Sequence, residues 1–139
     1  MTLKLKPKGE IKMGLTHVVV RLFHSHSQDT YSQETYSEDF LVDTGSMDTM
    51  APASALKKIG IQPDGKDVYE LASGELVEYE YGSAKVEFMG EIVPVRIIFG
   101  PDDSAPILGV VALETAGYIV DPKNQVLNKL KALPLKRVA

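Results

Sequence analysis

Residues 40–50 read FLVDTGSMDTM, a short apolar run followed at once by an aspartate, a hydroxyl residue, a glycine and a second hydroxyl residue. A carboxylate at the end of a buried strand is costly unless a partner stabilises it or a reaction uses it. Gly45 permits a tight turn, and the hydroxyls of Thr44 and Ser46 can bond to backbone or carboxylate oxygens. The stretch therefore predicts a loop that orients the Asp43 carboxylate, although by itself it fits a simple strand-ending turn equally well.

The composition is that of a globular protein. The chain has 139 residues, 44% of them hydrophobic and 24% charged, which predicts a single domain over residues 1–139. We find no apolar stretch of transmembrane length and no signal-peptide pattern, so we expect a cytoplasmic protein without a membrane partner. The absence of cysteine excludes disulfides, thiolate metal sites and a cysteine nucleophile. The net charge of −4 argues against nucleic acid as the main partner.

Alternating apolar residues and turn signals predict a mainly β chain. Strands are expected over 16–24, 40–42 and 107–108, in one hairpin centred on 72–75, in a second hairpin over 83–99, and on both sides of the turn DPKN at 121–124. Helices are expected within 51–61 and over 110–116, each stopped by a glycine. A polar loop is expected at 25–37, and basic tails at both ends. About seven strands and one or two short helices predict a closed or orthogonally packed barrel or sandwich.

The order of these parts resembles the retropepsin-like aspartic proteases, especially their small bacterial single-domain members. The resemblance covers about residues 16–127 and rests on FLVDTGS at 40–46, ASGE at 72–75 and APILGVVALETAGYIVD at 105–121. The polar insertion at 25–37 and the lysine-rich carboxyl end match nothing definite in that family.

The resemblance implies the acid protease fold and a role for each matched segment. Asp43 would be the catalytic aspartate, Thr44 would hydrogen-bond across a subunit interface, and Gly45 would let two such loops approach each other. The flap that closes over the substrate would be the hairpin tip, formed by Ala72, Ser73, Gly74 and Glu75. The segment beside the catalytic loop would be formed by Ile107, Leu108 and Gly109.

Aspartic protease chemistry needs two carboxylates that share one proton, one as general base on a water and the other as proton donor to the scissile carbonyl. This chain has one Asp-Thr-Gly motif, since Asp64 lacks the following hydroxyl residue and Asp121 lacks the glycine. We therefore expect a symmetric homodimer that cleaves polypeptides with Asp43 of both chains at the two-fold axis. Ser46 is expected to support the catalytic loop and to bond to the ionised partner of the dyad. No metal or cofactor enters this scheme.

Two alternatives remain open. The first alternative to the enzyme is a non-catalytic peptide-binding or scaffolding domain of the same fold. The second is a monomer whose unpaired Asp43 has no activity. A serine hydrolase is disfavoured because the sequence has no Gly-x-Ser-x-Gly elbow. His24 and His26 are expected to be loop residues rather than metal ligands.

Three residues near the motif have ordinary explanations. We expect Asp48 to brace the loop, although a contact with substrate is the alternative. Met47 and Met50 are expected to fill gaps in the core.

Overall fold

The structure is a computed structural model that describes residues 16–24 and 34–133. Most of the expected insertion at 25–37, and most of the two basic tails, lie outside the described residues. The predicted insertion nevertheless extends too far, because Tyr36 and Ser37 belong to a strand. Tyr36 pairs with Leu22, and its ring packs edge-on against Phe40 with a centroid distance of 6.3 Å.

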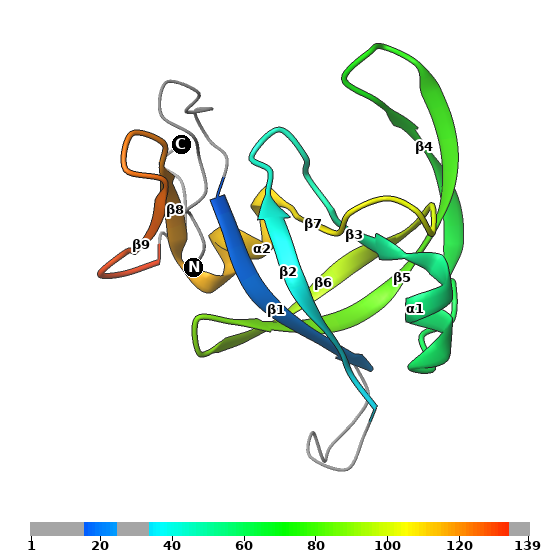
Figure 1. Cartoon of the computed structure of the whole chain (residues 1–139), viewed down its shortest axis with the longest axis horizontal. Helices are drawn as coiled ribbons and strands as arrows, with labels where there is room; N and C mark the ends of the chain where they lie inside the picture. The colour runs from blue at the N-terminus through cyan, green and yellow to red at the C-terminus, as the bar shows by residue number, and fades with distance from the viewer. Residues whose placement is uncertain (1–15, 25–33, 134–139) are drawn as a thin grey trace, which may run out of the picture.

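The described residues form nine strands and two short helices (Figure 1). The strands are β1 (Thr16–His24), β2 (Tyr36–Val42), β3 (Thr49–Pro52), β4 (Gly65–Glu70), β5 (Leu76–Phe88), β6 (Glu91–Gly100), β7 (Ile107–Leu108), β8 (Tyr118–Asp121) and β9 (Val126–Lys129). The helices are α1 (Ala53–Lys58) and α2 (Val110–Ala116). No helix among the described residues combines the length and apolar character that crossing a membrane would require.

Seven of the strands form a sheet that closes on itself. Their order is β1-β2-β7-β3-β6-β5-β4, and β1 makes a second, antiparallel pairing with β5. This second pairing joins β1, β2, β7, β3, β6 and β5 into a ring and leaves β4 outside it. Closing a sheet into a barrel removes its free edges and encloses a core. The expected mainly β, closed fold is confirmed.

The core follows the alternation of the strands. In β6, Val93, Val95 and Ile97 are buried, whereas Arg96 is exposed. Helix α2 adds a second set of buried residues, Ala112, Leu113 and Ala116. Gly117 ends this helix in the left-handed conformation with a φ of 83°, as the sequence predicted.

Strand β5 differs most from the expectation. We expected two separate hairpins, but residues 76–88 form one strand of 13 residues. Its first half pairs with β4 and its second half with β6. Gly82 lies inside it because the space is tight, not because the chain turns: a Cβ there would lie 2.7 Å from the carbonyl oxygen of Gln62.

Short elements account for the other differences. Strand β3 was not predicted, because its four residues lie between a turn and a helix. Its last two, Ala51 and Pro52, fell within the range expected for the helix, which begins only after Pro52. Gln125 was expected in a strand but has a φ of 56°, and its N–H donates to the carbonyl oxygen of Asp121 at 2.7 Å. Strand β1 spans the expected range 16–24, so His24, which was also expected to be a loop residue, is its last residue.

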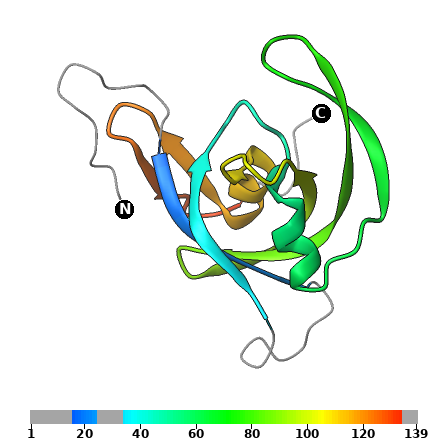
Figure 2. The same cartoon turned by 45° about the vertical axis from the view of Figure 1, so that its right-hand side comes forward.

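The hairpin of β4 and β5 extends beyond the barrel, at the same end as the loop that follows β2 (Figures 1 and 2). Its tip is a turn in which the Leu71 N–H donates to Glu75 O at 2.8 Å and the Gly74 N–H donates to Leu71 O at 2.8 Å. Gly74 has a φ of 91°, which favours glycine. The fold thus brings a projecting hairpin and the Asp43 loop to one end of the molecule.

Candidate active site

The loop of residues 43–48 connects β2 to β3, and β7 lies between these two strands. Strand β7 runs parallel to β2, with Val42 opposite Leu108, and antiparallel to β3, with Met50 opposite Ile107. The Asp43 N–H donates to the Leu108 carbonyl oxygen at 3.0 Å. Both ends of the loop are therefore fixed by the same two-residue strand.

Within the loop, a tight turn orients the Asp43 carboxylate. Its Oδ1 accepts a hydrogen bond from the Gly45 N–H at 2.9 Å, and its carbonyl oxygen accepts one from the Ser46 N–H at 3.1 Å. Asp43 is half-buried, while Thr44 and Gly45 are exposed. The carboxylate is thus held in one direction at the surface of the chain, next to an exposed hydroxyl.

The first N–H groups of α2 bond to carbonyl oxygens of the same loop. Val110 donates to Ser46 O at 2.8 Å, and Val111 donates to Met47 O at 3.2 Å. The helix has no side-chain cap, so these carbonyls satisfy donors that would otherwise lack helical partners. One step earlier, the Gly109 N–H donates to the buried Thr49 hydroxyl at 3.0 Å. The structure therefore brings residues 107–109 and the Asp43 loop together.

The Ser46 hydroxyl bonds within its own loop. It donates to the Asp48 carbonyl oxygen at 2.8 Å. A hydroxyl has one proton, and here a backbone acceptor takes it. Within the chain Ser46 therefore braces the loop, and the bond to the ionised partner of the dyad stays a prediction.

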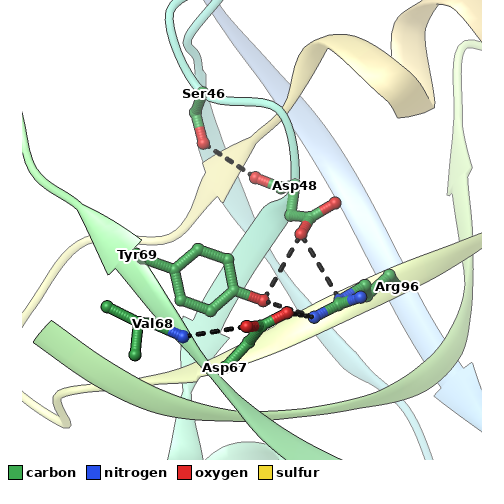
Figure 3. A network of polar contacts seen from close by, with 6 residues as sticks. All are labelled: Ser46, Asp48, Asp67, Val68, Tyr69 and Arg96. Carbon is green, nitrogen blue, oxygen red and sulfur yellow. Dashed lines mark hydrogen bonds and ion pairs between the residues drawn. The ribbon is translucent and has the colours of Figure 1, made fainter.

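A polar network that the motif did not reveal joins this loop to the projecting hairpin (Figure 3). Asp48 Oδ2 lies 3.6 Å from Arg96 Nε and 3.5 Å from the Tyr69 hydroxyl. Arg96 Nη2 donates to Asp67 Oδ2 at 2.9 Å and to the Tyr69 hydroxyl at 3.1 Å. Asp48 thus braces the loop, as expected, but against β4 and β6. The sequence did contain a sign of this contact, since Arg96 interrupts the otherwise apolar run IVPVRIIF.

The remaining candidates are placed as follows. The flap tip Ala72, Ser73, Gly74 and Glu75 is exposed. Met47 is 68% exposed and fills no core gap, whereas Met50 packs against Gly100, whose added Cβ would lie 2.7 Å from the methionine sulfur. In the described part of the chain, no group of three or more His, Asp or Glu side chains could hold a metal ion. His26 lies outside the described residues.

Gly109 lies close against the backbone of the Asp43 loop. A Cβ at this position would lie 2.5 Å from the Asp48 carbonyl oxygen and 2.6 Å from that of Met47. We predict that Gly109→Ala lowers the free energy of unfolding by at least about 2 kcal/mol, because the loop must shift to make room. Urea unfolding measures this change.

Gly90→Ala is the matched control for that substitution. A Cβ there meets no atom within 4 Å, but Gly90 has a φ of 81°, so backbone strain costs about 1 kcal/mol. Equal destabilisation by the two substitutions would contradict the close approach at Gly109.

The Asp48 carboxylate provides a test by pH. Burial raises the pKa of Asp48 above the usual 3.8, and the attraction of Arg96 offsets only part of that rise. Folding therefore favours the neutral form, whose contribution to stability is complete below the usual pKa and is lost as the pH rises through the folded pKa. We predict that the free energy of unfolding of the native chain, minus that of Asp48→Asn, falls as the pH rises from below 3.8 toward neutrality. Urea unfolding at a series of pH values measures it, and a difference that increases with pH would contradict the assignment.

Comparison with known proteins gave both similar solved structures and a family. Similar solved structures include the EIAV protease complexed with the inhibitor HBY-793 (18% identity over 84% of this chain and 95% of that chain, TM-score 0.49). A retropepsin-like aspartic protease from Rickettsia conorii has 16% identity over 79% and 88%, with a TM-score of 0.47. The retroviral protease-like domain of Ddi1 from Leishmania major has 14% identity over 84% and 90%, with a TM-score of 0.48. A search of curated proteins gave no match. The aspartyl protease family model matches residues 32–111, more than half of the chain, and the chain therefore belongs to the aspartyl protease family.

Proposed function

We propose that this chain is an aspartic endopeptidase that acts as a homodimer. The observation that carries the proposal is the Asp43 carboxylate, which the Gly45 N–H holds at 2.9 Å in a half-buried loop fixed by β7. Membership of the aspartyl protease family supports the assignment. A peptide-binding module would have no need of a carboxylate fixed in this way.

The dimer follows from the chemistry. Two carboxylates within hydrogen-bonding distance cannot both ionise easily, so such a pair retains one proton at moderately acid pH. Each chain supplies one Asp-Thr-Gly motif, and a two-fold axis beside Asp43 supplies the second carboxylate. The exposed hydroxyl of Thr44 is available to bond across such an axis.

The reaction then proceeds without a covalent intermediate. The ionised Asp43 takes a proton from a water molecule as the water oxygen attacks the peptide carbonyl carbon, while the protonated Asp43 gives its proton to the carbonyl oxygen. The tetrahedral diol collapses when the protonated carboxyl gives its proton to the leaving nitrogen, a diol hydroxyl gives its proton to the other, ionised carboxylate, and the C–N bond breaks. The pair ends with one proton, as it began.

The hairpin of β4 and β5 would act as the flap. Its tip, residues 72–75, projects from the same end of the barrel as the Asp43 loop (Figures 1 and 2). An extended polypeptide bound under it can donate and accept main-chain hydrogen bonds as an added strand does. Closure over the substrate would exclude bulk water from the carboxylates.

The test is peptide-bond cleavage of an unfolded protein over the range of acid to neutral pH. We predict that Asp43→Asn lowers kcat/KM by at least about a hundredfold, because the amide can neither take nor give the proton. Asp103→Asn, at an exposed loop position, serves as the matched control and keeps full activity. If the native chain binds peptides but cleaves none, the chain is a scaffold and the proposal fails.

Mixing the two proteins tests the dimer in the same assay. When native chain and Asp43→Asn are mixed in equal amounts and allowed to exchange subunits, about a quarter of the dimers carry two Asp43 residues. Activity should then fall to about half of that shown by the same amount of native chain alone. Undiminished activity would mean that each chain works by itself.

A further inference from the structure

The guanidinium of Arg96 lies where the catalytic loop, both strands of the hairpin and the barrel meet (Figure 3). It contacts Asp48 in the loop at 3.6 Å, and Asp67 in β4 at 2.9 Å. Its Cζ lies 3.6 Å from the centre of the Tyr81 ring in β5. Arg96 itself belongs to β6, in the wall of the barrel.

We propose that Arg96 is a positioning residue that fastens the flap hairpin to the loop carrying Asp43. Its place in the reaction rests on the proposed function, whereas the mechanical link between hairpin and loop does not. Arg96 is not a catalytic residue, since it acts through Asp48, Asp67 and Tyr69.

The chemistry of the site suits an arginine. A guanidinium can donate to several acceptors in its plane while its face stacks on an aromatic ring, and a lysine ammonium cannot do both. Here the Nη2 atom bonds to Asp67 and to the Tyr69 hydroxyl, while the face lies over Tyr81. One side chain therefore holds both strands of the hairpin.

The link between loop and hairpin depends on Arg96 because the groups that it joins include two carboxylates. Asp48 comes from the loop and Asp67 from the hairpin, and their mutual repulsion contributes to the raised pKa of Asp48. Arg96 is the cation between them. Without it, two carboxylates would face each other across the junction, so attraction between loop and hairpin would become repulsion.

The pairing of the hairpin shows which face is held. Asp67 pairs with Tyr79 and Tyr69 with Val77, and directly opposite residues share a face. Tyr69, Val77 and Tyr79 are half-buried on this face. The other face is mostly exposed, and its ion pair between Lys57 Nζ and Glu80 Oε1, at 3.9 Å, contributes little.

Amide hydrogen exchange of the full chain tests the link without any assay of cleavage. We predict that Arg96→Met speeds exchange about five- to tenfold in residues 65–70 and 76–81, because the hairpin opens more often. Exchange in the barrel strand 92–99 should stay within about twofold.

Arg21→Met is the matched control. Like Arg96, Arg21 pairs with a carboxylate and lies near an aromatic ring: its Nε donates to Glu87 Oε1 at 2.7 Å, and its Cζ lies 4.7 Å from the centre of the Phe23 ring. These contacts are in β1 and in the half of β5 that is remote from the hairpin. It should leave hairpin exchange unchanged. Equal exchange of the hairpin in the two variants would overturn the proposal.

Two milder variants guard against a general loss of folding. Tyr69→Phe removes only the hydroxyl that bonds to Asp48 and Arg96, and should speed hairpin exchange about two- to threefold. Arg96→Lys keeps the positive charge but loses the planar set of guanidinium donors. Its hairpin exchange rate should lie between those of the native chain and Arg96→Met. If both exchange as the native chain does, Arg96 does not fasten the hairpin.

Kinetics test the role in the reaction. A loosened flap weakens substrate binding in ground and transition states alike, so Arg96→Met should raise KM about tenfold and change kcat less than about twofold. The acidic and basic limbs of the pH–rate profile should stay at the same pH values, because β7 still orients Asp43. A large fall in kcat with an unchanged KM would overturn the positioning role. If the native chain itself cleaves nothing, the proposed function fails, and the exchange measurement alone decides whether the link exists.

Discussion

The pairing of β7 with β2 on one side and β3 on the other is the constraint on which the site depends. Two residues, Ile107 and Leu108, fix both ends of the Asp43 loop through backbone hydrogen bonds. Gly109 then lets the chain pass within van der Waals distance of the loop carbonyls, and α2 begins by donating to them. The orientation of the carboxylate is therefore a property of the barrel, and the closed sheet keeps it rigid.

The loop and the hairpin are held by different kinds of interaction. Backbone hydrogen bonds and a buried threonine hold the loop. The hairpin leaves the barrel and is tied to the loop by half-exposed charged and aromatic side chains around Arg96. Interactions of the second kind are weaker and open more readily. In the proposed function the hairpin would open while the carboxylate stays fixed, because substrate must enter and product must leave an endopeptidase.

Features with a local signal could be predicted from the sequence. The helix ending at Gly117, the turn at Gly74 and the Asp43 turn all depend on neighbouring residues whose preferences are strong. Features set by distant contacts could not. The two expected hairpins share one continuous strand through Gly82, whose close neighbour Gln62 lies 20 positions away in the sequence. The backbone acceptor of the Ser46 hydroxyl, the Asp48 carbonyl oxygen, is visible only in three dimensions, and the contact between Arg96 and Asp48 joins residues 48 positions apart.

The proposed activity requires that the Asp43 residues of two chains meet at one two-fold axis. A crystal structure of the protein would measure the distance between their carboxylate oxygens directly. We predict a symmetric dimer in which the nearest oxygens are about 2.5–3.0 Å apart, the length of a hydrogen bond that holds one proton. A structure in which the chain is monomeric, or in which the two carboxylates of a dimer face away from each other, would contradict it.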